Sequence, residues 1–455
     1  MNQRLILHID MNSYFATMEQ QAHPNLRGKP IGVAGKTKGE RTVITAASVE
    51  AKKFGLKSGM SAWEARRLCP DLIIVPANYD RYIFTSKLIF DLLERFSPKV
   101  DIFSIDEAFL ELSPKFEYRS TKQIRNLNFE NSKLVSNLGF RSLLTPIKYW
   151  DYIQAINIAQ QIKHLIKIQI GSWVTCSVGI SYGKTLAKLA SEQQKPDGLT
   201  IIRPEDFAKI AQTTPIEELC GVGFRLQPRL NRMGITTIAD LGRMPKDMLI
   251  SVFGAHTGGW LHRIGNGIDD GVLHSFRTLE REKSIGHSYT LPQDLTNISD
   301  VKKILLLLAE RVGVRLRAKH LVGKTISVYL RFEDFASWSE RRTQKEYLLD
   351  GYQIYRAGEQ LLNNFRQLKP IRLVGITISN LIDQNETTTP IFVTDQANEQ
   401  LTHALDKINN RWGEWTIHRG LIHKVRSRIS NLPDGRNSRT YQPEVTHINP
   451  FTKRA

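Results

Sequence analysis

Two adjacent carboxylates, Asp106 and Glu107, stand in the otherwise apolar, strand-like run FSIDEAFLEL at residues 103–112. Buried charges are tolerated in a protein only when they are paired or when they coordinate a metal. No lysine or arginine lies within this run. The fold therefore has to supply these acids with a partner from elsewhere in the chain, or with a metal ion.

A third acid, Asp10, ends the first strand candidate, LILHID at residues 5–10. In a regular strand Asp106 and Glu107 would point to opposite faces, so a turn or twist is needed for both to converge. If Asp10 lies beside them, three carboxylates can hold two magnesium ions about 3.5–4 Å apart, as in phosphoryl or nucleotidyl transfer. The alternative is a turn acid beside a solvated one, and an isolated Asp-Glu pair favours that alternative.

The composition limits the class of partner. The chain has 455 residues, of which 41% are hydrophobic, and this length suggests about three or four domains. Lys and Arg number 63 against 45 Asp and Glu, a net charge of +18, which favours nucleic acid or an anionic membrane surface as partner. No apolar run approaches the roughly 20 residues of a membrane span and the N-terminus lacks a signal-peptide pattern, so we expect a cytoplasmic protein.

The three cysteines, Cys69, Cys176 and Cys220, stand far apart and share no metal-ligand spacing. We expect reduced, partly buried thiols. Neither a zinc site nor a disulfide framework is predicted.

The hydrophobic pattern predicts an α+β fold for the first 200 residues. A small helical and loop-rich unit is expected after the first strand. Residues 114–150 are basic and rich in Asn and Ser, which indicates an inserted loop or subdomain. The expected helices are 46–55, closed by Gly55, 61–69 with a Ser61/Glu64 capping box, 80–96, 151–169 and one from 184, and the expected strands are 71–76, 100–112 as a hairpin, and 173–181.

The second half changes character twice. Residues 203–268 show short helices separated by glycines, and residues 269–283 are typical of a linker. Beyond them the pattern predicts a β-α-β-β-α-β order, which is a ferredoxin-like arrangement. Its expected elements are strand 284–290, helix 299–319, strands 323–332 and 338–348, helix 353–368 and strand 371–379, followed by a polar tail at 384–455 with one amphipathic helix near 397–412.

Four stretches occur in the order found in one polymerase family: LHIDMNSYFA (7–16), SIDEAFLEL (104–112), CSVGISYGKTLAKLASEQQKPDGL (176–199) and CGVGFRLQPRLNRMGI (220–235). Through residue 383 the chain resembles the Y-family translesion DNA polymerases of the bacterial DNA polymerase IV and V type. The resemblance implies a multidomain α+β right-hand fold. Its parts would be a ferredoxin-like palm (1–13 and 80–202, with insert 114–150), small fingers (14–79), a helix-hairpin-helix thumb (203–268), a linker (269–283), a β-α-β-β-α-β little finger (284–383) and a tail (384–455).

The resemblance also implies a reaction and its residues. The expected activity is template-directed, low-fidelity addition of dNMPs to a primer 3′ end with two Mg²⁺ ions. Asp10, Asp106 and Glu107 match the family's catalytic metal ligands, and the backbone carbonyl of Met11 matches a further one. The alternatives are a non-catalytic DNA-binding member that recruits other factors and a metal-dependent nuclease.

The nucleotide site is expected at Tyr14, Phe15, Lys52 and Lys195. Phe15 matches the family's steric gate, although an ordinary core aromatic is the alternative. Lys195 matches the lysine that contacts the triphosphate. Where many relatives carry tyrosine and arginine, this chain has Val49 and Lys52, and lysine lacks the bidentate fork of arginine, so we expect weaker nucleotide affinity. Polymerase V-type members also use lysine here, so activity is expected to be retained.

Two regions are predicted to bind DNA. Gly221 and Gly223 resemble a helix-hairpin-helix turn, in which backbone N–H groups approach a phosphate, and a helix C-cap is the alternative. Strand alternation places Arg331, Arg341 and Lys345 on the outward face of the C-terminal sheet, where a merely solvated basic face is the alternative.

The expected partners are primer–template DNA, dNTPs and a sliding clamp. The segment TTPIFVTD at 388–395 is a degenerate clamp-binding peptide centred on Ile391 and Phe392, with local packing as the alternative. We expect a monomer associated with the bacterial nucleoid and no membrane partner.

Overall fold

The computed structural model of the chain describes residues 4–35, 41–112, 147–275, 282–366, 369–387, 393–413 and 415–426. These residues form two compact units. The first consists of the described residues up to 275 without Arg41, and the second consists of Arg41 and the described residues from 282 onward. The predicted insert at 114–150 lies outside the described residues except for its last four, which begin a helix. Ile391 and Phe392 also lie outside them.

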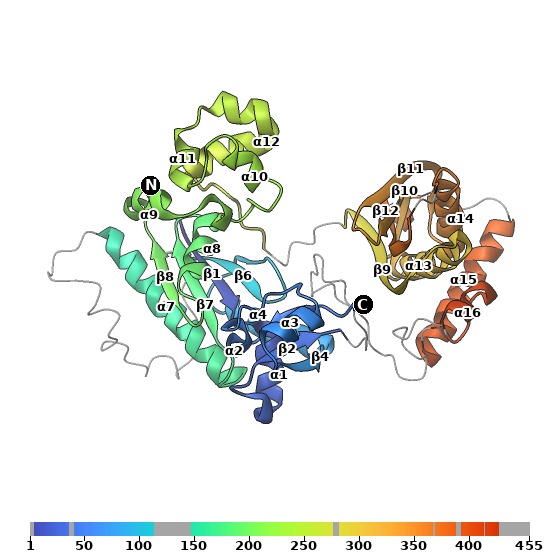
Figure 1. Ribbon diagram of the computed structural model, residues 1–455, viewed down its shortest axis with the longest axis horizontal. Helices are drawn as coiled ribbons and strands as arrows, with labels where there is room; N and C mark the ends of the chain where they lie inside the picture. Colours follow the sequence, from blue (N-terminus) through green and yellow to red (C-terminus); the bar gives the residue numbers. More distant parts are fainter. Residues whose placement is uncertain are drawn as a thin grey trace. The chain divides into compact units, whose positions relative to one another are not determined.

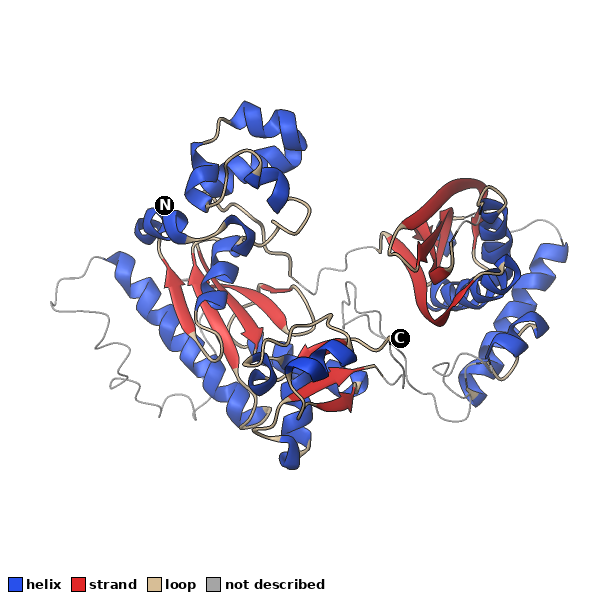
Figure 2. Ribbon diagram, viewed as in Figure 1, coloured by secondary structure: helices blue, strands red, loops and turns tan. Residues whose placement is uncertain are grey.

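The first unit is built on a five-stranded sheet (Figures 1 and 2). Its order is β5 (Val100–Ile102), β6 (Glu107–Leu112), β1 (Leu5–Met11), β7 (Cys176–Ser181) and β8 (Leu199–Ile202). The central strand β1 runs antiparallel to both β6 and β7. The sheet therefore places the end of the first predicted strand beside the start of the strand that carries the paired acids.

Helices cover both faces of this sheet. Alternate residues of β1, such as Leu7 and Ile9, share a core with α4 (Tyr79–Leu93) and α7 (Ile147–Gln169). On the other face Ile6 packs with Ala187 of α8 (Lys184–Gln193). A Cβ at Gly179 would lie 2.0 Å from the carbonyl oxygen of Ala187, so glycine allows α8 to approach the sheet closely.

A second, small sheet follows the first strand, where a helical and loop-rich unit was expected. It has the order β3 (Ile44–Ala47), β2 (Ile31–Ala34) and β4 (Ile73–Pro76), with α1 (Tyr14–Ala22), η1 (Pro24–Leu26), α2 (Val49–Lys52) and α3 (Ala62–Leu68) around it. Both β2 and β3 were missed, because segments of four residues are too short to show a periodicity that separates strand from helix.

The predicted helix 46–55 is wrong. Residues 46 and 47 pair with β2, and Ser48 caps a single helical turn by accepting a hydrogen bond from the Ala51 amide at 3.2 Å. The capping box of the next helix is confirmed, because Ser61 accepts from the Glu64 amide at 3.1 Å and Glu64 accepts from the Ser61 amide at 2.9 Å.

Short helices form the rest of the first unit, as the glycine-separated pattern predicted. They have their own apolar core, which includes Leu230, Leu241 and Leu261. The elements are η2 (Pro204–Asp206), α9 (Phe207–Thr213), η3 (Ile216–Glu218), α10 (Gln227–Asn231), α11 (Ile238–Arg243) and α12 (Lys246–Gly265).

The second unit has the predicted β-α-β-β-α-β order. Its elements are β9 (Ser284–Leu295), α13 (Ile298–Ala318), β10 (Leu321–Phe332), β11 (Ser337–Leu348), α14 (Gly351–Leu362) and β12 (Ile371–Asp383). The strands form one antiparallel sheet in the order β11-β10-β12-β9. Ile326, Val328 and Leu330 face a core shared with α13 and α14, so the opposite face of the sheet carries the alternate, polar residues.

The polar tail is more structured than the sequence indicated. After η4 (Gln384–Glu386), α15 (Val393–Trp412) covers the predicted amphipathic helix, and a further helix, α16 (Gly420–Arg426), was missed. Ile422 is fully buried in the core of the second unit, and Arg317 of α13 binds both carboxylate oxygens of Asp406 at 2.6 and 2.9 Å. The described part of the tail therefore belongs to the second unit.

None of the described helices is long and apolar enough to cross a membrane. The three cysteines are free thiols: Cys69 and Cys176 are buried and Cys220 is half-buried.

Candidate active site

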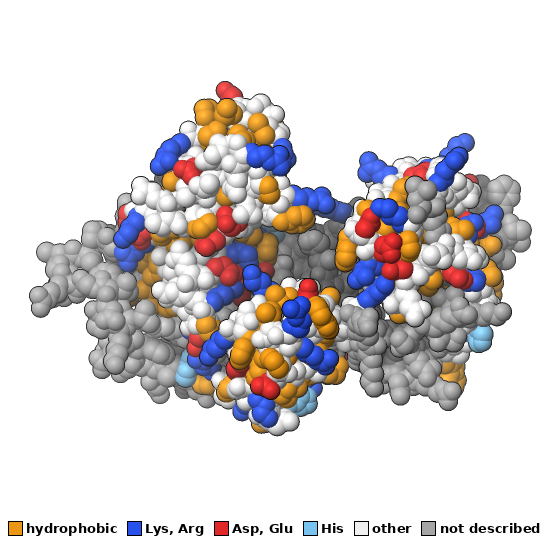
Figure 3. Space-filling model, in the orientation of Figure 1, with side chains coloured by type: hydrophobic (Ala, Val, Ile, Leu, Met, Phe, Trp, Pro, Cys, Tyr) orange, Lys and Arg blue, Asp and Glu red, His pale blue; other side chains and the backbone are white. Residues whose placement is uncertain are grey.

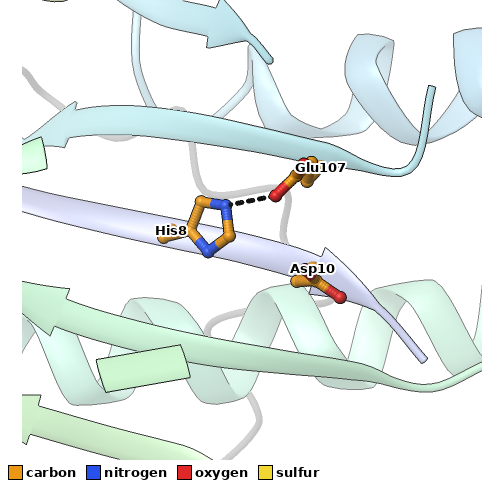
Figure 4. Close-up of side chains that lie close together, drawn as sticks. All are labelled: His8, Asp10 and Glu107. Atoms are coloured by element: carbon orange, nitrogen blue, oxygen red, sulfur yellow. Dashed lines mark hydrogen bonds and ion pairs between the residues drawn. The ribbon is translucent and has the colours of Figure 1, made fainter. Parts of the chain in front are cut away.

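Asp10 and Glu107 lie directly opposite each other on the neighbouring antiparallel strands β1 and β6. Cross-strand partners point to the same face of a sheet, and His8, two residues before Asp10, shares that face. His8, Asp10 and Glu107 each offer one possible ligand atom, and these three atoms all lie within 4.8 Å of one another (Figure 4). The pairing register thus creates a cluster of potential metal ligands.

Asp106 stands just before β6, in the hairpin turn that joins β5 to β6. The amides of Phe103 and Ser104 both donate to the Glu107 carbonyl at 3.1 Å, and the Met11 amide donates to the Asp106 carbonyl at 3.0 Å. The Asp106 carboxylate accepts a hydrogen bond from the Ser104 hydroxyl. The turn therefore fixes Asp106 against the end of β1, while its carboxylate is not part of the 4.8 Å set.

His8 holds Glu107 in place. The ring is fully buried, its Nε2 lies 3.0 Å from Oε2 of Glu107, and its Nδ1 lies 2.7 Å from the hydroxyl of Ser191. Burial lowers the pKa of His8 and so favours the neutral ring. Since both ring nitrogens are engaged, His8 acts on the site by orienting Glu107.

The positive partner that run 103–112 lacks comes from α8. Lys188 forms an ion pair with Glu107. Burial alone would raise the pKa of Glu107, but the hydrogen bond from His8 and the charge of Lys188 outweigh it and lower the pKa to about 2. Glu107 is therefore a carboxylate at any physiological pH.

Two further lysines converge on Asp10. Nζ of Lys195 lies 2.9 Å from Oδ1 of Asp10 and 2.7 Å from Oε1 of Glu192. Burial, followed by the positive charge of Lys195, lowers the pKa of Lys52 in α2. The predicted triphosphate lysines thus lie at the acid cluster, although Lys195 and Lys52 come from segments far apart in sequence. Val49 begins α2.

Phe15 and Tyr14 occupy different environments at the start of α1. Phe15 is half-buried; its ring stacks on Tyr82 with a centroid distance of 4.3 Å and an interplanar angle of 11°, and meets Tyr79 edge-on at 6.0 Å. Tyr14 is buried and donates its hydroxyl to the Tyr82 carbonyl at 2.7 Å. Its ring therefore packs in the core, which leaves Phe15 as the partly exposed aromatic beside β1.

The acids fit a site for a divalent cation such as Mg²⁺. Mg²⁺ prefers carboxylate, carbonyl and water oxygens, and Asp10, Asp106 and Glu107 supply carboxylates. Burial raises the pKa of Asp10, which Lys195 opposes, and burial together with the charge of Glu107 raises the pKa of Asp106. Burial thus disfavours the charged form of both carboxylates, and a divalent cation bound between them would stabilise that form.

Gly221 and Gly223 lie in the loop before α10. Gly221 has φ +106°, and a Cβ there would lie 2.8 Å from the ring of Trp260, so this position requires glycine. Gly223 has open space around it and no such requirement.

The predicted basic residues of the second unit lie on its sheet. Arg341 and Lys345 are exposed on β11, whereas Arg331 on β10 is half-buried and donates from Nε to the Tyr329 hydroxyl at 3.1 Å. Blue Lys and Arg side chains also appear on the visible faces of both units in Figure 3.

Sequence reasoning missed His8 and Lys188. Strand alternation could have placed His8 on the face of Asp10. Lys188 is 81 residues from Glu107, and no local pattern links the two.

Three family models match the chain. The impB/mucB/samB family covers residues 9–192, its C-terminal domain covers 282–391, and the DNA polymerase-iota thumb domain covers 217–269.

Curated relatives are similar over nearly their whole length. The DNA polymerase IV of Moorella thermoacetica is 34% identical over 418 residues, which are 91% of this chain and 95% of the relative. The DNA polymerase IV of Pelotomaculum thermopropionicum is 36% identical over 417 residues, 91% of this chain and 94% of the relative. Among solved structures, a Y-family DNA polymerase chimera of Dbh and Dpo4 aligns with a TM-score of 0.66 at 24% identity and covers 83% of this chain and 99% of that one.

The fold is that of a multidomain α+β polymerase of the right-hand type with a helical thumb, as predicted. The chain belongs to the impB/mucB/samB family, and the expected kinship with the bacterial DNA polymerases IV is confirmed. It shares its fold with a Y-family DNA polymerase. It is an enzyme, a DNA-directed DNA polymerase.

Proposed function

We propose that this polymerase extends a primer 3′ end by two-metal nucleotidyl transfer and copies past damaged template bases. The observation that carries the proposal is the register of β1 and β6, which sets Asp10 opposite Glu107 and fixes Asp106 beside the end of β1. A carboxylate cluster of this kind is what in-line transfer at a phosphorus requires.

Each acid would have its own role in holding Mg²⁺. Asp10 and Asp106 would bind both ions, the Met11 carbonyl would add a ligand, and Glu107 would help to hold the ion nearer the primer 3′-hydroxyl. When bound, the ions supply charge stabilisation and lower the pKa of that hydroxyl. His8 and Lys188 keep Glu107 ionised and oriented.

The incoming nucleotide is held by two lysines that lie near Asp10. Lys195 and Lys52 neutralise the triphosphate, and their closeness to each other supports this role, because two ammonium groups attract a polyanion. Phe15 lies under the sugar as a gate against ribonucleotides, with Tyr82 and Tyr79 holding its ring.

We further propose the division of the chain into palm, fingers, thumb and little finger at the boundaries predicted from the sequence. In this division Gly221 and Gly223 in the thumb and Arg331, Arg341 and Lys345 in the little finger contact the DNA backbone. The fingers are small, since their sheet has three strands of four residues each. A small fingers unit leaves the template base accessible, and the translesion role rests on this analogy with the family.

A sliding-clamp contact near Ile391 and Phe392 and work at the bacterial nucleoid belong to the same proposal. A DNA substrate and the family's bacterial relatives support the nucleoid. The clamp contact and the monomeric state stay predictions.

Primer extension tests the function. The assay uses a 5′-labelled primer, Mg²⁺ and all four dNTPs on an undamaged template and on one with a single abasic site. We expect extension on both, with a pause at the lesion. Primer shortening would indicate the nuclease alternative, and binding without extension would indicate the recruitment alternative. Complete arrest at the abasic site would contradict the translesion role.

A further inference from the structure

The turn at residues 195–198, which follows α8 and carries Lys195, is held by side chains from other elements. Asp197 has φ +56°, a left-handed conformation that is uncommon for residues other than glycine and that Asp adopts more readily than most. Such a conformation persists when surrounding contacts determine it. The contacts that hold Asp197 therefore help to set the backbone position of Lys195, two residues earlier in the same turn.

Lys163 of α7 supplies most of these contacts. Its half-buried Nζ lies 2.7 Å from the Asp197 carbonyl, 2.7 Å from Oδ1 of the same residue, 2.8 Å from the Cys176 carbonyl and 3.1 Å from the Gly198 carbonyl. Lys167 binds the other carboxylate oxygen of Asp197 at 2.8 Å. Burial opposes ionisation of Asp197, but these two lysines lower its pKa, so the turn is fixed by a charged anchor.

Asn12 ties the same turn to the strand that carries Asp10. This buried residue accepts hydrogen bonds at Oδ1 from the Asp197 amide at 2.8 Å and from the Thr175 hydroxyl at 3.0 Å, and donates from Nδ2 to the Ser177 hydroxyl at 2.9 Å. Asn12 follows Asp10 by two residues. Hydrogen bonds thus connect the turn to the end of β1, close to Asp10, and to α7.

We propose that Lys163, acting through Asp197, is a positioning residue that sets Lys195 for the triphosphate of the incoming nucleotide. The inference rests on the proposed role of Lys195. A lysine side chain is long and flexible, so the placement of its backbone decides whether Nζ meets the phosphates. A displacement of about 1 Å at such a group costs up to about 100-fold in rate.

The test is a double-mutant cycle in the full chain. Lys163→Met and Lys195→Met are made singly and together, with Lys163→Arg as the conservative variant. Lys99→Met is the matched control, because Lys99 is in the same unit but contacts Glu111 at 3.3 Å. Single-nucleotide insertion gives kcat and KM for the dNTP, and titration with an unreactive dNTP analogue gives its Kd on the primer–template complex. Primer–template Kd and a melting curve accompany each variant.

We expect Lys163→Met to raise KM and the analogue Kd by about 10-fold, while primer–template Kd stays within about twofold. Lys163→Arg should recover most of the loss, and Lys99→Met should change nothing. Because both lysines act on one contact, the double variant should be no worse than Lys195→Met, within about twofold.

The results distinguish a failure of the proposed role of Lys195 from a failure of the proposed role of Lys163. If Lys195→Met leaves KM unchanged, the proposed role of Lys195 fails, and this inference with it. If Lys195→Met raises KM while Lys163→Met lowers only kcat or the melting temperature, Lys195 stands and Lys163 is merely structural. Multiplying effects in the double variant would also overturn the proposal. Should Lys163→Met not fold, Asp197→Asn keeps the shape of the turn and is expected to raise KM by about threefold.

Discussion

The ring of Phe15 is held on two sides, by the stacked ring of Tyr82 and the edge-on ring of Tyr79. A ring fixed in this way cannot move aside for a ribose hydroxyl, and forcing extra atoms into a tight contact costs about 1–3 kcal/mol. Phe15→Ala should therefore raise the ratio of rNTP to dNTP insertion efficiency by roughly 5–150-fold. Steady-state insertion of matched rNTP and dNTP pairs measures this ratio.

Tyr14→Phe is the matched control for the gate. It removes only the hydroxyl that binds the Tyr82 carbonyl and keeps the neighbouring ring, so the ratio should stay unchanged. If Phe15 were only a core residue, its truncation would destabilise the fold by about 3–5 kcal/mol. An unchanged ratio together with a lower melting temperature would show that Phe15 is a core residue and not a gate.

At the residue scale, the local pattern offered Asp10 beside Asp106 and Glu107 as one of two alternatives, and the family resemblance decided between them. The structure places Asp10 opposite Glu107, whereas their roles as ligands stay predictions. Of the two groups that stabilise Glu107, Lys188 was not predictable, because it reaches Glu107 only through the packing of α8 on the sheet.

At the element scale, β11 offers a comparison within one strand. Arg341 and Arg342 are both exposed neighbours, but alternation points them to opposite faces of the sheet, and Arg341 pairs with Ser327 on the face away from α13 and α14. We expect Arg341→Ala to weaken DNA binding on all sequences alike and to reduce the slope of log K against log salt by about 1. Salt titrations by fluorescence anisotropy measure it. An equal loss of DNA affinity in Arg342→Ala would show that DNA binding does not depend on the face of the sheet that carries Arg341.

Strand β9 carries a histidine that should make the second unit acid-sensitive. Burial, and then the charges of Arg311 and Arg315, lower the pKa of His287 to about 4. The unfolded chain binds a proton near pH 6.5 and the folded chain only near pH 4, so stability falls as the pH drops through this window. Between pH 7 and pH 5 this residue should cost about 2 kcal/mol of stability.

Hydrogen exchange of the β9 and β12 amides at the two pH values, corrected for intrinsic rates, reads this loss locally. His287→Gln should lose less protection on acidification than the wild type, whereas the exposed His403→Gln of the same unit should behave as the wild type. Equal losses in all three proteins would rule His287 out as the acid-sensitive group.

Which elements were predictable follows from their periodicity. The β-α-β-β-α-β order was predicted because its strands alternate and its helices are amphipathic over many residues. The helix expected at 46–55 failed because ITAA and the following VEAK each span one short element, and pairing with β2 decided between strand and helix. Likewise, α16 was missed because its seven residues are too few to show a helical period, and its burial depends on the packing of Ile422 in the core of the second unit.

At the scale of the whole molecule, the net charge of +18 indicates that phosphate contacts supply much of the DNA affinity. The second unit includes the described tail, since Ile422 and Trp415 are buried in its core. A clean deletion therefore runs from residue 281 to the end of the chain. The remaining unit, which has its own cores, should bind primer–template DNA more weakly on every sequence, with a smaller salt slope. An unchanged affinity of the truncated protein for primer–template DNA would contradict the proposed DNA contacts of the little finger.

Single-turnover insertion by Glu107→Gln tests whether the carboxylates at the β1–β6 junction hold the metal ions for nucleotidyl transfer. Gln keeps the size of Glu and a hydrogen-bond acceptor for His8. Glu111→Gln is the control, because Glu111 lies four residues further along the same strand and outside the cluster. We expect Glu107→Gln to lower the insertion rate by on the order of 10³-fold or more, with primer–template Kd and the Glu111→Gln rate within about twofold of wild type. Near-normal insertion by Glu107→Gln would contradict the account.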